Sequence, residues 1–254
     1  MLHRLTITAC VLLFAAPALA GYTAVYSPPG GELNHNEILT GIYGGVWAPA
    51  YAWPGATSYT NGAITATRVH DWGTPGGVFG PAGERYDGDH GGIAGENLEV
   101  CYPGIPDYPI TDQIWVDGTI TATARARYAG KSQEFGYDLG ASGSYTKLFD
   151  VAGSGFAVTG AAGPMTIGPL FAWARADDSS AGLVNPHWSH DGLNADGFDH
   201  MVTDRVTGAG ITAPTWLLFW EDVNGARGVS DRDFNDLVIE IVCIPVPGAV
   251  LLGM

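Results

Sequence analysis

The chain has 254 residues and carries 26 acidic against 11 basic side chains, which gives a formal net charge of −15. Lys131 and Lys147 are its only lysines, so it lacks the basic surface of a nucleic-acid-binding protein, and attraction to an anionic membrane is not expected. Its 37 glycines and 16 prolines favour many turns and few long helices. The acidic charge is compatible with cation binding, although solubility alone would also explain it.

The first twenty residues have the pattern of a secretory signal peptide. Arg4 gives a basic start, residues 5–16 form an apolar run, and residues 18–20 have the small-x-small pattern after which signal peptidase cleaves. The apolar run is too short for a stable membrane span. A lipoprotein signal at Cys10 is disfavoured, because most of the apolar stretch follows that cysteine. We therefore expect cleavage near Ala20 and a secreted, extracellular or cell-surface protein.

A short helix is predicted early in the exported chain. Residues 21–33 are interpreted as a flexible lead-in, and Asn34 then has Glu37 three positions later. This spacing is that of a capping box, in which each side chain accepts from the other residue's backbone N–H. We predict a helix over residues 34–39.

Most of the remaining chain is predicted to form strands and turns. Alternating or continuous apolar patterns of strand length mark residues 63–69, 120–128, 145–151, 165–174, 200–206, 216–221 and 237–243. Residues 71–113 are interpreted as a long loop or insertion that could contain short strands. The two most apolar runs, 215–220 and 237–242, suit central strands buried against a second sheet. The predicted fold is an all-β, antiparallel, jelly-roll-like β-sandwich with long Gly/Pro-rich loops and one short helix.

The strongest chemical signal is an acidic loop over residues 231–236, preceded by Glu221 and Asp222 at the end of an apolar strand. Ca²⁺ prefers several oxygen ligands, many of them charged, on a flexible turn. Alternate residues of this loop can converge on an ion if the backbone curls, and the preceding acids could complete the shell. The predicted calcium ligands are Glu221, Asp222, Asp231, Asp233, Asn235 and Asp236. The alternative is a solvated turn held by Asx hydrogen bonds.

An EF-hand is excluded for this loop. Asp236 stands where that motif needs glycine, and no Glu stands at its twelfth position. Further metal ligands could come from the segment 191–200, through Asn194, Asp196 and Asp199. Its composition is also that of tight turns, and a turn is the favoured interpretation.

Three histidines, His187, His190 and His200, suggest a zinc site, which their Pro- and Gly-rich surroundings disfavour. No His-Glu-x-x-His pattern, Gly-x-Ser-x-Gly elbow or phosphate-binding loop occurs. Paired carboxylates are uninformative in so acidic a chain. We expect no enzymatic activity, and an exported hydrolase is the least favoured alternative.

Aromatic residues offer a second candidate function. Trp47, Tyr51, Trp53 and Tyr59 lie among Pro, Gly and Ala, and could form a sugar-stacking face. Packing within the protein is favoured for them, because aromatic residues are common in sandwich cores. A carbohydrate-binding module is therefore the alternative to a structural calcium-binding domain.

Two cysteines remain after the expected signal cleavage. Cys101 and Cys243 could form one disulfide in an oxidising compartment, and two buried free thiols are the alternative.

Four sequence blocks resemble a known bacterial family. They are Phe135-Gly136-Tyr137, residues 194–200, residues 218–222 and residues 230–238, in this order and spacing. Together they resemble the extracellular domain of unknown function 4114, over roughly residues 130–244. The resemblance implies a β-rich domain of exported and surface proteins, often adhesin-like, and its acidic blocks imply calcium ligation at the six residues named above.

The tail resembles the start of a PEP-CTERM sorting signal, with Val246 in place of the signal's Glu. We accordingly divide the chain into a signal peptide (1–20), a β-rich region (21–129) continuous with the next, a calcium-loop sandwich (130–244), and the start of a truncated sorting segment (245–254). The expected function is an exported, non-catalytic calcium-binding domain with a structural or adhesive role. Its expected partners are surface polysaccharide or other matrix components, without nucleic acid or a stable membrane span.

Overall fold

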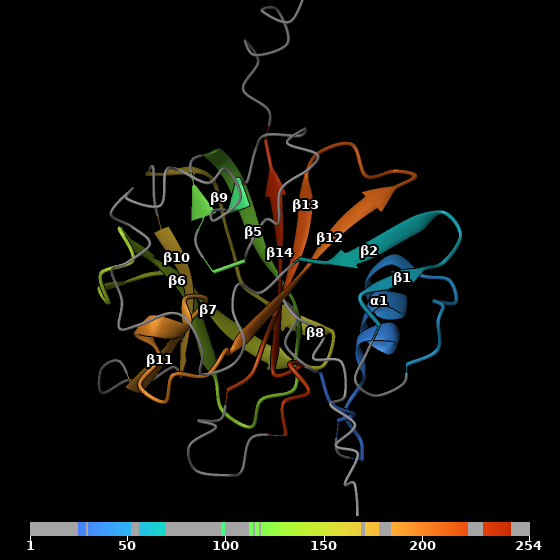
Figure 1. Ribbon diagram of the computed structural model, residues 1–254, viewed down its shortest axis with the longest axis horizontal. Helices are drawn as coiled ribbons and strands as arrows, with labels where there is room; N and C mark the ends of the chain where they lie inside the picture. Colours follow the sequence, from blue (N-terminus) through green and yellow to red (C-terminus); the bar gives the residue numbers. More distant parts are fainter. Residues whose placement is uncertain are drawn as a thin grey trace, which may run out of the picture.

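A computed structural model of the chain describes residues 25–28, 30–51, 56–69, 98–99, 112–113, 115–116, 118–168, 171–177, 184–222 and 231–244. The predicted signal peptide and tail lie outside these residues. The described part consists of two β-sheets packed face to face, with a helix on the outer side of one sheet (Figure 1). No helix in the described ranges is long and apolar enough to cross a membrane.

The first sheet is antiparallel throughout and has the order β1-β2-β12-β13-β14-β5-β9. Its strands are β1 (Ser58–Thr60), β2 (Ile64–Arg68), β5 (Gly118–Arg127), β9 (Ala161–Ile167), β12 (Met201–Gly208), β13 (Thr215–Trp220) and β14 (Leu237–Cys243). Strands from the predicted N-terminal region, β2 and β5, therefore pair with strands of the predicted calcium-loop domain.

The second sheet has the order β3-β4-β10-β6-β7-β8, and β11 also pairs with β10. Its strands are β3 (Leu98–Glu99), β4 (Trp115–Val116), β6 (Gln133–Leu139), β7 (Tyr145–Ser154), β8 (Ala157–Thr159), β10 (Phe171–Asp177) and β11 (Val184–Trp188). The short β3–β4 pair is parallel, whereas the other pairs are antiparallel. The predicted all-β sandwich is confirmed.

One predicted strand, over residues 165–174, is wrong. Its first part belongs to β9 in the first sheet, and its last part belongs to β10 in the second sheet. Gly168-Pro169 separates the two parts in the sequence, and this turn signal outweighs the apolar residues on either side. The prediction also missed β6, whose residues Gln133, Glu134 and Asp138 are polar but buried.

Strands β13 and β14 are buried on both faces, which explains their nearly continuous apolar sequences. Trp216, Leu218 and Trp220 pack into the core between the two sheets. On the opposite face, Leu217 and Phe219 pack against residues of the helix and the segment before it. The prediction of two central strands is therefore confirmed, although only one of their faces meets the second sheet.

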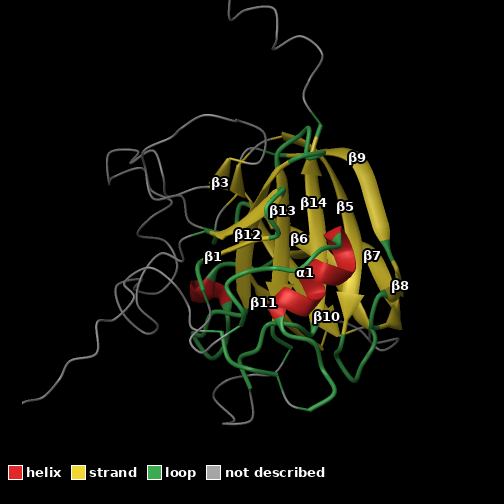
Figure 2. Ribbon diagram, turned by 90° about the vertical axis from the view of Figure 1, so that its right-hand side faces the viewer, coloured by secondary structure: helices red, strands yellow, loops and turns green. Residues whose placement is uncertain are grey.

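The helix α1 (His35–Tyr43) covers the outer face of the first sheet (Figure 2). Its N-cap is Asn34, and the capping box with Glu37 is present as predicted. Ile38 and Leu39 are fully buried against the sheet. The helix is four residues longer at its C-terminal end than the predicted residues 34–39, because Tyr43 also bonds the sheet through Glu240 of β14.

The N-terminal segment, residues 25–28 and 30–34, is packed against the sandwich and is not a flexible lead-in. Val25 is buried, and its carbonyl accepts a hydrogen bond from the Tyr51 hydroxyl. The Tyr26 N–H donates to the Arg232 carbonyl at 2.9 Å. The expectation of flexibility came from glycine and proline content, which says nothing about these long-range contacts.

Truncation of Leu39 should show how much this outer layer stabilises the fold. Leu39→Ala should lower the free energy of unfolding by about 2–5 kcal/mol, because it leaves a cavity between α1 and the sheet. The neighbouring Thr40→Ala, on the exposed side of the helix, should change it by less than about 0.5 kcal/mol. Urea denaturation would measure both, and equal effects would contradict the proposed packing.

Candidate metal centre

The acidic loop, residues 231–236, lies where the β13–β14 hairpin leaves the core. Trp220 pairs with Leu237 across these antiparallel strands. The next residues outward, Glu221 and Asp236, are therefore placed opposite each other by the strand register. The sequence of two buried strands thus brings two carboxylates together at one end of the sheet.

The loop backbone alternates between ordinary and left-handed conformations. Arg232 and Phe234 both have φ of 54°, a conformation that costs about 1–2 kcal/mol for a residue with a side chain. Phe234 is fully buried in the outer core, the apolar layer between α1 and the first sheet. Burial of a Phe side chain contributes about 2–3 kcal/mol, which offsets the cost of the left-handed conformation. The Arg232 guanidinium lies 4.8 Å from the centre of the Phe198 ring. These two anchors hold the loop in a curled form, which is the condition under which its alternate residues could converge on one ion.

The first carboxylate group consists of Glu221, Asp233 and Asp236. One carboxylate oxygen from each lies within 4.8 Å of the other two. Two oxygens that bind one Ca²⁺ at about 2.4 Å lie at most about 4.8 Å apart, so this spacing is compatible with a shared ion. The structure therefore brings together three of the six predicted ligands from the two sides of the hairpin.

The second carboxylate group consists of Glu32, Asp231 and Asp233, whose oxygens also lie within 4.8 Å of one another. Asp233 thus belongs to both groups. Glu32 comes from the N-terminal segment and was not predicted as a ligand. Nothing in its local sequence marks it, because its position depends on how that segment packs beside the loop. Among the described residues, both groups consist of carboxylates only, and no histidine takes part.

Two buried oxygens at the centre have no hydrogen-bond partner in the described part of the chain. They are Oδ2 of Asp233 and Oδ1 of Asn235, on side chains that are 2% and 0% exposed. Asp233 Oδ1 accepts from the Asn235 N–H, and Asn235 Nδ2 donates to the Leu33 carbonyl. A buried oxygen without a partner destabilises the folded state, and a bound cation would satisfy both of these atoms. Carboxylate and amide oxygens are the ligands that fit Ca²⁺.

Burial and mutual repulsion hold protons on this centre. Burial, together with repulsion from the Asp231 carboxylate, raises the pKa of Asp233 to about 8. Burial also raises the pKa of Asp236 well above its usual range, with added repulsion from Asp222 and Glu221. Either protons or a cation must therefore neutralise these carboxylates in the folded state.

The backbone of Asp233 is held from the helix side by a neutral histidine. His35 Nε2–H donates to the Asp233 carbonyl at 3.2 Å, and His35 Nδ1 lies 3.4 Å from Arg68 Nη2. Burial and the Arg68 charge lower the pKa of His35 to about 3, so the ring is neutral and its Nδ1 can accept. Arg68 in turn forms a buried ion pair with Asp204 at 2.9 Å. This chain of contacts ties the loop to β2 and β12.

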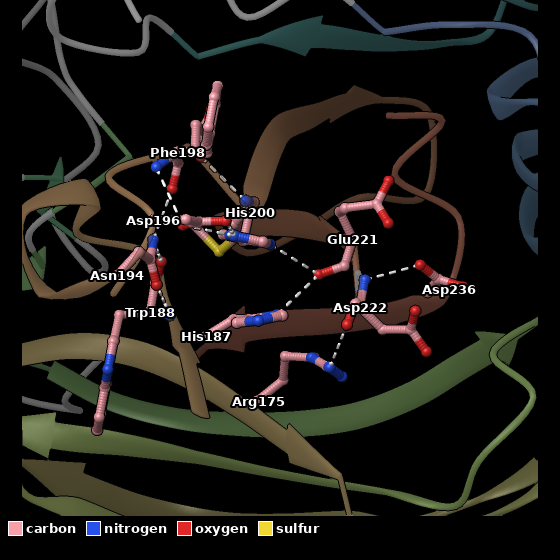
Figure 3. A network of polar contacts seen from close by, with 12 residues as sticks. Arg175, His187, Trp188, Asn194, Asp196, Phe198, His200, Glu221, Asp222 and Asp236 are labelled. Atoms are coloured by element: carbon pink, nitrogen blue, oxygen red, sulfur yellow. Dashed lines mark hydrogen bonds and ion pairs between the residues drawn. The ribbon is translucent and has the colours of Figure 1, made fainter. Parts of the chain in front are cut away.

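The backbone of Glu221 and Asp222 is held from the other side (Figure 3). The stacked rings of His187 and His200, with centroids 3.8 Å apart, both donate through Nδ1 to the Glu221 carbonyl. Arg175 donates to the Asp222 carbonyl, and the Asp222 N–H donates to Asp236 Oδ2 at 2.7 Å. Figure 3 shows the Glu221 carboxylate pointing away from the two rings. Sequence reasoning missed this network, having considered the histidines only as zinc ligands.

The structure places the other predicted ligands outside both carboxylate groups. Asp222 accepts through its carboxylate from Gln133 Nε2 at 3.2 Å. Asn194 uses its amide to bond the backbone of Trp188 and Phe198, which is the turn role favoured above.

The remaining polar residues of this turn bond their neighbours. Asp196 contacts His200 Nε2 at 3.1 Å, and Asp199 accepts from the Met201 N–H. His190 accepts from the Gly192 N–H, at the start of a short 3₁₀ helix, Asp191–Leu193.

Two further predictions concern aromatic and cysteine residues. Trp47 and Tyr59 are 4% and 2% exposed and belong to the outer core, so neither offers a stacking face. Trp53 lies outside the described residues. Cys243 is buried and disulfide-bonded, whereas its predicted partner, Cys101, lies outside the described residues.

Comparison with known proteins identifies one family. Residues 168–243 match a family described as a domain of unknown function, DUF4114. This match confirms the predicted resemblance over a narrower range than residues 130–244. It contains the acidic loop and Glu221, whereas Glu32 and α1 lie outside it. No curated protein and no solved structure matches the chain.

The pKa shifts predict how pH affects the metal-free protein. Above about pH 7.5, one unit above the ordinary pKa of histidine, the buried His35 and His187 are almost entirely neutral in both the folded and the unfolded state and contribute almost no pH dependence. Asp233 keeps its proton up to about pH 8 when folded, whereas the unfolded chain loses it near 3.8. The folded state therefore binds more protons, and its stability falls as pH rises. In EDTA, the melting temperature should be lower at pH 9 than at pH 7.5. A constant or rising value would contradict the assigned protonation.

Proposed function

We propose that the protein is an exported, non-catalytic domain that binds Ca²⁺ at the end of the β13–β14 hairpin. The observation that carries this proposal is the unpartnered oxygen of the buried Asp233, whose carboxylate lies close to those of Glu221 and Asp236. A cation there would replace the protons that burial otherwise retains on Asp233 and Asp236. The ion would thereby remove the repulsion between these groups.

The ligand chemistry favours calcium over other common metal ions. The candidate ligands are carboxylate oxygens, and the same loop carries the buried, unpartnered amide oxygen of Asn235. Zinc and copper sites usually include His or Cys, and magnesium usually keeps several waters in a strict octahedron. A buried group of oxygens from a curled loop is more compatible with the larger and more flexible coordination of Ca²⁺.

A structural role is supported by where the ligands come from. Glu221 directly follows β13, Asp236 directly precedes β14, and Asp233 lies in the loop between them. The unfolded chain does not hold these groups together, so the ion would bind the folded state preferentially. Calcium at about 100 times its Kd would then stabilise the fold by about 2.7 kcal/mol.

The role outside the cell is supported by the sequence. The signal-peptide pattern supports export, and the family resemblance supports a surface or matrix setting in which the domain has an adhesive or structural part. Surface polysaccharide or another matrix component is the proposed partner. The carbohydrate-binding alternative gains no support from Trp47 and Tyr59, because both are buried.

Asparagine substitutions in the first carboxylate group test the proposal. Asp233→Asn and Asp236→Asn keep an oxygen for the backbone N–H groups of Asn235 and Asp222 but remove a ligand charge. In EDTA at pH 8.5 each variant should melt at or above the wild-type temperature, because a repelling charge is gone. In excess Ca²⁺ the wild type should rise by several degrees, roughly the effect of 1–3 kcal/mol, and the variants should rise much less.

Asp150→Asn is the matched control, because Asp150 is exposed and lies on β7 outside both groups. It should keep the full calcium response. Absence of any calcium-dependent rise in the wild-type protein would refute the proposal. If the variants were less stable than the wild type by the same amount with and without calcium, the acidic loop would stabilise the fold without binding calcium.

A further inference from the structure

We propose that a second Ca²⁺ binds beside the first, between Glu32, Asp231 and Asp233, with the Asp233 carboxylate bridging the two ions. This inference rests on the proposed calcium site and extends it to a segment outside the matched family region. The second ion would join the N-terminal segment to the acidic loop.

The shared position of Asp233 is the geometric basis for a pair of ions. In each of the two groups, one Asp233 carboxylate oxygen lies within 4.8 Å of an oxygen from each other member. A carboxylate has two oxygens and about four lone-pair directions. At Asp233, Oδ1 accepts a hydrogen bond from the Asn235 N–H, and Oδ2 has no partner among the described residues. The side chain therefore has the capacity to bind two ions at once, and its 2% exposure keeps bulk water from satisfying that oxygen.

Charge also favours a second ion. Five carboxylates make up the two groups. Within the described ranges, none of Glu32, Asp231, Asp233 or Asp236 forms an ion pair with Lys or Arg. Arg232, in the loop itself, directs its guanidinium to the Phe198 ring. One divalent ion would neutralise two of the charges, and a second would leave a single negative charge for water and backbone N–H groups.

The N-terminal segment is already positioned for this role. The Tyr26 N–H donates to the Arg232 carbonyl at 2.9 Å, and the Leu33 carbonyl accepts from Asn235 Nδ2 at 3.1 Å. Glu32 lies between these two attachment points, so only its side chain has to adjust. A bond through the ion would add a third attachment, and it would secure the residues that lead into α1.

The experiment is a calorimetric titration of the purified protein with CaCl₂ alone, after removal of bound metal with EDTA. The wild type should bind two Ca²⁺ per chain, and Glu32→Gln should bind one. Glu37→Gln is the matched control, because it removes the same charge from an exposed residue five positions away. Glutamine also serves in a capping box, so the helix should be retained. This control should still bind two ions.

Amide hydrogen exchange of the N-terminal segment gives an independent readout. Calcium should slow exchange over residues 25–34 in the wild type and in Glu37→Gln, but much less in Glu32→Gln. The melting temperature of Glu32→Gln in EDTA should match or exceed that of the wild type, which checks that the variant folds.

The outcomes separate the two proposals. One ion in both the wild type and Glu32→Gln would overturn the second site and leave the first intact. Two ions in both proteins would also overturn the assignment to Glu32. No binding to the wild type would overturn both proposals, whereas loss of one ion together with the segment's protection would support the bridged pair.

Discussion

The fold depends on the need to bury β13 and β14 on both faces. Their side chains alternate between the core that the two sheets share and the layer under α1. Burial of each large apolar side chain is worth about 1.5–3 kcal/mol, so the strands require a cover on each side. The second sheet provides one cover, and α1 with the N-terminal segment provides the other. Residues near the start of the chain are thereby fixed beside a hairpin near its end.

This double burial also sets the chemistry at the end of the hairpin. Glu221 and Asp236 follow and precede the fully buried pair Trp220 and Leu237, so their carboxylates lie at the edge of a region that excludes water. Burial opposes their charge, and the curled loop adds Asp233 to the same place. The strand packing that stabilises the fold thus creates an electrostatic cost, which a bound cation would offset locally.

Sequence patterns predicted the features that depend on near neighbours. The capping box at Asn34, the strand β14 and the acidic hairpin connection each follow from residues a few positions apart. Glu32 could not be predicted as a member of the centre, because its place depends on backbone contacts with Arg232 and Asn235. The polar strand β6 was missed for a similar reason, since its polar residues are buried by tertiary packing. The periodicity of apolar residues does not predict contacts between residues far apart in the sequence.

The histidines around the acidic centre bond its backbone, whereas the candidate metal ligands are its carboxylate side chains. His35 donates to the carbonyl of Asp233, and the His187–His200 pair donates to the carbonyl of Glu221, so these bonds are made to the backbone and not to the carboxylates. His35 and His187 are buried with lowered pKa values, so they add no positive charge that would compete with a cation. A basic side chain in either place would neutralise the acidic groups permanently. His35 and His187 instead hold the backbone as neutral donors, so under the proposed function the acidic groups would exchange their protons for a cation.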